Sequence, residues 1–88
     1  MQQIVRTMKL LSDKSKFEIL CRIHKEPAYG KQLAQEMKLT SATISHHMSA
    51  LIAEGLVTMQ MEEKKVYYQP DKENLRRILD RCREVLGL

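Results

Sequence analysis

Apolar residues recur at helical spacing through the first 25 residues of the chain. The spacing predicts one helix over residues 2–11 and a second that runs to about Lys25, with Ser12 or Asp13 as its N-cap. The apolar stripe of the second helix consists of Phe17, Leu20, Cys21 and His24, widened by Ile19 and Ile23. A stripe of this width is typical of a central helix that packs on more than one side.

The next segment has the pattern of a helix, a short turn and a second helix. A proline and a glycine at residues 27–30 predict a break, and the apolar positions that follow predict a two-turn helix over residues 31–37. Thr40 or Ser41 then caps another helix, which ends at Gly55, a residue suited to the left-handed position after a helix. The segment therefore predicts a helix-turn-helix unit.

Beyond this unit the apolar period changes from 3.6 to 2. Val57, Met59 and Met61 alternate with polar residues, which predicts a half-buried strand. The charged residues 62–65 indicate a hairpin tip, and residues 66–69 a returning strand. We therefore expect a two-stranded hairpin directly after the helix-turn-helix.

The chain ends in a strongly amphipathic segment, residues 71–87, which predicts a final helix. The element order is then α-α-α-α-β-β-α, a mainly α fold with a small β-hairpin. A helix-turn-helix followed by a hairpin is a winged helix, in which the second helix of the pair enters the major groove of DNA. We expect the helix at about 41–54 to read DNA and the hairpin at about 57–69 to form the wing.

The expected reading helix lies in the longest charge-free part of the chain, residues 39–53, although 30% of all residues are charged. At about 100° per residue, one face of this helix is apolar and the other carries small, hydrogen-bonding side chains. The DNA-facing residues expected from that second face include Ser45, His46 and Ser49. His47 lies at the edge of the apolar face, so we expect it to be a packed, hydrogen-bonded residue.

Length and composition limit the remaining possibilities. Eighty-eight residues suffice for one domain, expected over residues 1–88, and 43% hydrophobic content argues against disorder. A pI near 9.2 is compatible with a nucleic-acid partner. No membrane span or signal peptide is apparent, and Cys21 and Cys82 both lie in apolar segments, so a soluble cytoplasmic protein without a disulfide is expected. No glycine-rich phosphate loop or nucleophile–base motif indicates an enzyme.

Four segments in order, LSDKSKFEILCRI, QLAQEM, TSATISHHMSALIAEGLV and KKVYYQP, resemble the arsenic-repressor-like (ArsR-type) family of bacterial winged-helix transcriptional regulators. The resemblance covers about residues 8–70. It implies a homodimeric repressor that is joined through its first and last helices and reads the major groove with its second motif helix. Carried over by position, the residues that read the groove are Ser41, Thr43, Ser45 and His46.

The chain departs from the metal-sensing members of that family. KQLAQEM lacks the Cys-x-Cys pair that some members carry, and the last helix lacks the histidine ligands that others carry. Cys21 and Cys82 alone are a poor zinc site, because structural zinc takes four ligands. We therefore expect no metal and no cofactor, and the inducer is undetermined. The wing tip, EEKK, also lacks the glycine common among relatives.

Phosphate contacts dominate the affinity of DNA-binding proteins, so lysines must flank the charge-free helix. The expected backbone and wing contacts are Lys31, Lys38, Lys64 and Lys65. The apolar stripes of the first and last helices are larger than so small a core can bury, which predicts a two-fold dimer. Such a dimer would bind a pseudo-palindromic operator in double-stranded DNA. The expected interface residues are Ile4, Val5, Met8, Leu75, Ile78, Leu79, Cys82, Val85 and Leu86.

Two alternatives remain open from the sequence. The winged helix could serve as a protein-interaction or dimerisation module rather than a DNA reader. It could also be the DNA-binding domain of a larger sensor protein.

Overall fold

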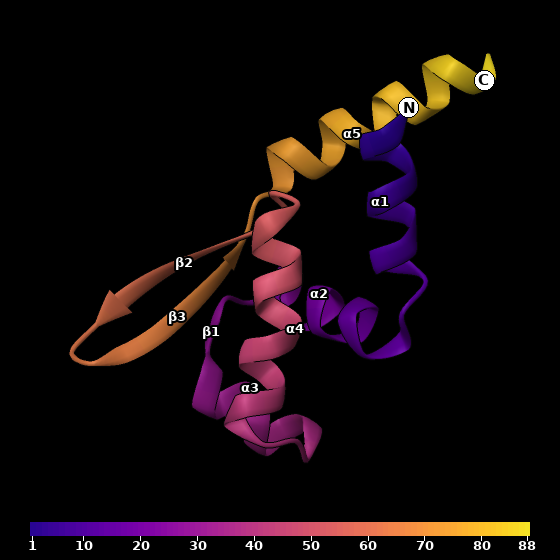
Figure 1. The fold of residues 1–88 in the computed structure, drawn as a ribbon. Coiled ribbons are helices and arrows are strands. Elements are labelled where there is room, and N and C mark those ends of the chain that lie inside the picture. Colours follow the sequence, from indigo (N-terminus) through magenta and orange to yellow (C-terminus); the bar gives the residue numbers. More distant parts are fainter.

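The computed structural model describes residues 1–88, a body with principal extents of 44 × 22 × 21 Å. The elements in chain order are α1 (Gln2–Leu11), α2 (Lys14–Lys25), β1 (Ala28–Tyr29), α3 (Gly30–Met37), α4 (Ser41–Ala53), β2 (Val57–Glu62), β3 (Lys65–Pro70) and α5 (Lys72–Leu86). The hairpin β2–β3 projects from one side of the body, and α1 and α5 lie on the other side (Figure 1). The predicted winged-helix fold is confirmed.

Side-chain caps fix where α2 and α4 begin, as Asp71 does for α5. Asp13 Oδ1 accepts a hydrogen bond from the backbone N–H of Lys16 at 3.1 Å, and α2 starts there. Thr40 Oγ1 accepts one from the backbone N–H of Thr43, also at 3.1 Å, and α4 starts there. Each oxygen satisfies an N–H that has no partner within the helix. Of the alternative N-caps predicted from the sequence, Asp13 caps α2 and Thr40 caps α4.

A third strand lies in the segment that the sequence predicted to be only a break. Ala28 and Tyr29 form β1, which pairs antiparallel with β3 opposite Tyr68 and Tyr67, so the sheet order is β1-β3-β2. Two residues are too few to display an alternating pattern, so this strand leaves no periodic signal in the sequence. Its pairing ties the base of the wing to the start of α3.

The core forms where α2, α4 and the base of the sheet meet. Thirteen buried apolar residues make one cluster, including Ile19, Ile23 and Met48. The predicted wide stripe of α2 was partly wrong, because Phe17 and Cys21 are exposed. α2 packs mainly on α1, α4 and β3, and these elements cover the side centred on Ile19 and Ile23.

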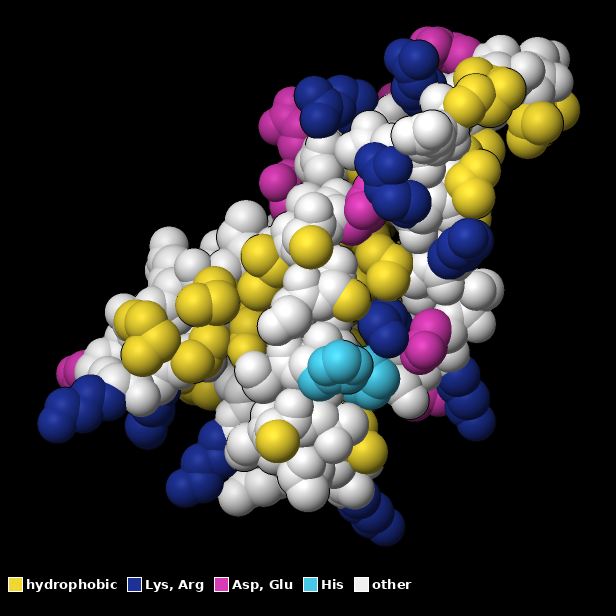
Figure 2. Space-filling view, in the orientation of Figure 1, with side chains coloured by type: hydrophobic (Ala, Val, Ile, Leu, Met, Phe, Trp, Pro, Cys, Tyr) yellow, Lys and Arg dark blue, Asp and Glu magenta, His cyan; other side chains and the backbone are white.

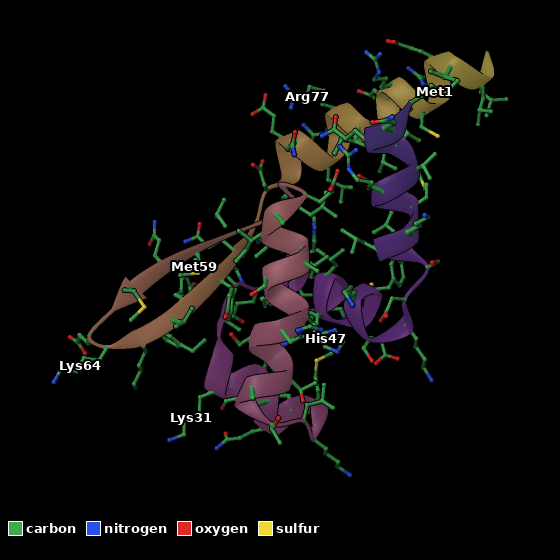
Figure 3. All side chains as sticks on the ribbon, in the orientation of Figure 1. Met1, Lys31, His47, Met59, Lys64 and Arg77 are labelled. Atoms are coloured by element: carbon green, nitrogen blue, oxygen red, sulfur yellow. The ribbon has the colours of Figure 1, made fainter.

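The predicted half-burial of β2 also fails along most of its length. Val57 is buried, whereas Met59 and Met61 are 51% and 61% exposed. The hairpin extends beyond the helices (Figure 1), and Met59, the third residue of β2, lies part-way along it (Figure 3). The alternation of apolar residues is real, but only its first member reaches the core.

The terminal helices α1 and α5 pack on each other. Ile4 and Ile78 are buried within the protomer, and Leu75 packs against the core cluster. Ile4 and Ile78 are thus covered without a second chain, and Leu75 is partly covered. The other expected interface residues form an exposed apolar strip, with Cys82 half-buried beside it: Val5, Met8, Leu79, Val85 and Leu86.

Gly55 joins α4 to the wing in a conformation that other residues adopt with difficulty. We expect Gly55→Ala to lower the free energy of unfolding by about 1–3 kcal/mol, because its φ of +77° is strained for an L side chain. An added Cβ would also lie 2.6 Å from Asn74 Nδ2, which donates a hydrogen bond to the Gly55 carbonyl oxygen at 2.8 Å. Urea unfolding of the variant measures this loss.

Gly87→Ala is a matched control for this substitution. Gly87 has a similar φ of +73°, but an added Cβ would meet no atom within 4 Å. It therefore isolates the cost of the left-handed backbone from the cost of the contact with Asn74. An equal loss of stability in the two variants would contradict a role for that contact.

Candidate nucleic-acid interface

The α4 helix divides into a buried face and an exposed face. Ile44, Met48 and Leu51 are buried in the core, since they recur at helical spacing on one side. The opposite side carries the expected groove-reading residues, of which Thr43 is half-buried and the others are exposed: Ser41, Thr43, Ser45, His46 and Ser49. The helix carries no charged side chain, so its surface presents hydroxyl, imidazole and methyl groups.

The hydroxyl groups on this face differ in which hydrogen-bond donors and acceptors remain free for a ligand. Thr40 donates to Thr43 Oγ1 at 2.9 Å, and Ser49 donates to the Ser45 carbonyl oxygen at 3.0 Å. Thr43 keeps its hydroxyl proton, whereas Ser49 keeps only its acceptor lone pairs. The side chains of Ser41 and His46 make no hydrogen bond within the protomer. The exposed face can therefore both donate to and accept from the edges of bases.

A groove of about 320 Å³ lies between the N-terminal part of α4 and the wing. Its apolar wall includes Ile44, Val66 and Tyr68, and burial raises the pKa of the Tyr68 phenol. Its other lining residues are polar or small: Tyr29, Gly30, Lys31, Ser41, Ser45, Lys64 and Lys65. The groove thus brings two expected base-reading serines together with three of the four expected phosphate-binding lysines.

The lysines reach this groove from separate elements. Lys31 extends from the first turn of α3, and Lys64 stands at the tip of the wing (Figure 3). Dark blue side chains project from the wing tip and from the end of the molecule where α3 meets α4 (Figure 2). Lys38, the fourth expected contact, is exposed with φ of 56° after α3 and does not line the groove.

The shape of the wing depends on residues that sequence reasoning did not single out. The Tyr29 hydroxyl donates to Glu62 Oε2 at 2.8 Å, which raises the pKa of Tyr29, and the Tyr29 ring lies 4.9 Å from that of Tyr67. Lys65 Nζ lies 5.6 Å from the centre of the Tyr29 ring. The tyrosine pair of KVYYQP, Tyr67 and Tyr68, was the available signal in the sequence. Together these contacts hold the wing against the start of α3.

The wing turns without a glycine at its tip. Glu63 and Lys64 have φ of 48° and 68°, the pair of positive values that a two-residue type I′ hairpin turn requires. Glycine or asparagine adopts these angles most easily, which explains why EEKK gave a weak turn signal in the sequence. The turn directs Lys64 outward from the end of the hairpin (Figure 3).

His47 is half-buried and hydrogen-bonded, as the sequence predicted. Its partner is Lys16 of α2, whose Nζ lies 3.2 Å from His47 Nδ1 and 3.4 Å from Asp13 Oδ2. Burial lowers the pKa of His47 below its ordinary value, and the Lys16 ammonium lowers it further. The sequence gives no sign that Lys16 is the partner of His47, since a contact across 31 positions leaves no local pattern.

No three side chains among the histidines, cysteines and acids lie close enough to hold a metal ion. Cys21 is exposed and Cys82 is half-buried, and both are free thiols. No helix has the length and apolar character needed to cross a bilayer.

The known proteins that resemble this chain are bacterial regulatory proteins. A family model described as "Bacterial regulatory protein, arsR family" matches residues 13–59. The arsenical resistance operon repressor of Staphylococcus aureus is 31% identical over 68 residues, which cover 77% of this chain and 65% of the relative, just under two thirds of its length.

Solved structures share the whole fold. An ArsR-like transcriptional regulator from Rhodococcus sp. RHA1 superimposes with a TM-score of 0.84 at 24% identity, over 98% of this chain and 80% of the other. A homodimeric winged helix-turn-helix DNA-binding domain of Mb0332 from Mycobacterium bovis superimposes with a TM-score of 0.79 at 23% identity, again over 98% and 80%.

Proposed function

Because this chain belongs to the ArsR family of bacterial regulatory proteins, we propose that it is a sequence-specific DNA-binding transcriptional repressor of the cytoplasm. The family is one of regulators and not of enzymes. The observation that carries the proposal is the groove between α4 and the wing. There the exposed serines Ser41 and Ser45 of a charge-free helix lie beside three lysines on two other elements.

The division between neutral and charged residues fits the two tasks of a DNA reader. Base contacts give specificity, and short hydroxyl side chains let a helix backbone approach the base edges closely. Phosphate contacts give affinity, and Lys31, Lys64 and Lys65 line the groove beside α4. Ser41, Thr43, Ser45, His46 and Ser49 are the base-reading residues in this proposal, and Lys38 adds a phosphate contact outside the groove.

The proposal includes a homodimer that binds a pseudo-palindromic operator. The exposed apolar strip on α1 and α5 supports it, since a small protein gains stability by covering such a surface. The Mb0332 domain is described as homodimeric. Two-fold symmetry would place the two α4 helices in successive major grooves about 34 Å apart.

Selection of duplexes from a random-sequence library by the purified protein tests the function directly. We expect an enriched, two-fold symmetric sequence whose binding constant falls steeply with salt. Ser45→Ala and His46→Ala should weaken binding to the enriched duplex while leaving thermal unfolding unchanged. A folded wild-type protein that enriches no sequence and binds no DNA would contradict the proposal and favour a protein-interaction module.

A further inference from the structure

The two adjacent histidines of α4 occupy different surroundings. His46 is exposed and makes no hydrogen bond, whereas the His47 ring is held from one side by α2. Lys16 Nζ lies 3.2 Å from His47 Nδ1, and the Lys16 side chain is only 14% exposed, so this lysine is packed rather than solvated. Asp13 anchors it, since its Oδ1 accepts from the Lys16 backbone N–H and its Oδ2 accepts from Nζ.

This contact fixes which nitrogen of His47 carries the proton. A lysine ammonium has three donors and no acceptor, so Nδ1 must offer its lone pair to Lys16. The hydrogen bond made by one ring nitrogen sets the state of the other. A neutral His47 therefore carries its proton on Nε2.

The second nitrogen of His47 remains free. Nε2 has no hydrogen-bond partner in the protomer, and it is not buried. It is therefore accessible to solvent. The His47 ring centre is 6.2 Å from that of His46, on the exposed reading face. Histidine side chains form a continuous surface patch over α4 in Figure 2, and Figure 3 places His47 between α4 and α2.

We propose that His47 is a further DNA-contacting residue, and that Lys16 positions it as a hydrogen-bond donor. Nε2–H of His47 donates to an acceptor on DNA, either a phosphate oxygen or a base acceptor such as guanine N7. Lys16 acts only through His47, by holding Nδ1 as the acceptor. The role of His47 rests on the proposed function, since it requires that α4 meets DNA.

The fixed donor differs in chemistry from its neighbour. His46 is free to present a donor or an acceptor, because no protein group holds either of its nitrogens. Toward DNA, Nε2 of His47 can only donate, whether the ring is neutral or protonated. The charged and titratable groups that face it are Lys16 and Asp13 from α2 and His46 from α4. Burial and the Lys16 ammonium both lower the pKa of His47, which favours its neutral form.

Long-range ¹H–¹⁵N spectra of the free protein test the tautomer. We expect the ¹⁵N shifts of His47 at neutral pH to show a protonated Nε2 and an unprotonated Nδ1. Lys16→Met keeps the packed stem and removes the ammonium, so the His47 shifts should move toward the averaged values of a free imidazole. Lys14→Met removes the same charge from an exposed lysine nearby and should leave them unchanged. A protonated Nδ1 in the wild type would overturn the proposal.

Binding to the duplex enriched by the wild-type protein tests the contact. We expect His47→Leu, which cannot donate, to weaken binding by about tenfold or more, and His47→Gln, which can donate, to retain most of it. An equal loss on unrelated duplexes identifies a phosphate, and a loss confined to the enriched duplex identifies a base. Circular dichroism melting confirms that both variants are folded.

The outcomes separate this inference from the proposed function. A folded His47→Leu variant that binds as tightly as the wild type would overturn the DNA contact while leaving the repressor function intact. A wild-type protein that binds no duplex would overturn both, whereas the tautomer is decided by the nitrogen spectra of the free protein alone.

Discussion

Replacing Lys31, Lys64 and Lys65 together by glutamine is expected to weaken binding to the enriched duplex by roughly two to three orders of magnitude per bound protomer near 0.1 M salt. The three lysines line one groove beside the reading helix, while α4 itself carries no charge that could neutralise phosphate. Each phosphate contact contributes about 0.9 to the slope of log binding constant against log salt, so the slope should fall by about 2.7 per protomer. Fluorescence anisotropy at several salt concentrations measures both quantities.

A second triple variant controls for the change in net charge. Lys9, Lys25 and Lys72 are exposed lysines on α1, α2 and α5, and none of them lines the groove. Replacing them by glutamine removes the same three charges from a protein of formal charge +4. We expect a much smaller loss of affinity and little change of slope. Equal losses in the two triple variants would mean that long-range attraction, and not the groove, supplies the affinity.

Leu79→Asp combined with Val85→Asp is expected to convert the proposed homodimer to a monomer and to weaken operator binding by at least about a hundredfold. Both side chains lie in the exposed apolar strip of α5, 44% and 48% exposed in the protomer, so the substitutions cost little within one chain. Figure 2 shows hydrophobic side chains gathered over the outer end of α5 and along α1. Carboxylates buried between two chains would lack partners, and separated protomers would lose the gain from binding two half-sites at once.

Light scattering at micromolar concentration measures the change in mass, and anisotropy measures the change in affinity. Lys25→Glu, at an exposed position on α2, makes the same change of two charge units away from the strip and should remain dimeric. A wild-type protein that is monomeric under these conditions would refute the proposed dimer. A dimeric double variant would place the interface elsewhere.

Local signals in the sequence were sufficient for most helices of this fold. The predicted ranges 2–11 and 31–37 agree with α1 and α3 within one residue at each end. Asp13, Thr40 and Gly55 mark helix boundaries because a cap oxygen or a left-handed glycine acts within a few residues of its own position. The winged-helix order follows from these boundaries and the change of period after Gly55.

The candidate site was predictable in its helix and much less so in its surroundings. The exposed and buried faces of α4 follow from the helical repeat, so Ser45 and His46 could be placed on the surface in advance. The exposure of Met59 depends on how far the hairpin extends beyond the helices. The alternation of apolar and polar residues along the strand does not encode this distance.

The sequence by itself therefore determined the helices, the hairpin and the uncharged character of α4, and it narrowed the caps of α2 and α4 to two neighbouring residues each, because these features depend on interactions between residues close in the chain. Only the tertiary structure decided what each surface meets. It paired β1 with β3, gathered Lys31 and Lys64 around one groove, and brought Lys16 to His47 across 31 positions. Such contacts depend on the relative placement of whole elements, which is set by packing of the shared core and has no counterpart in any local pattern.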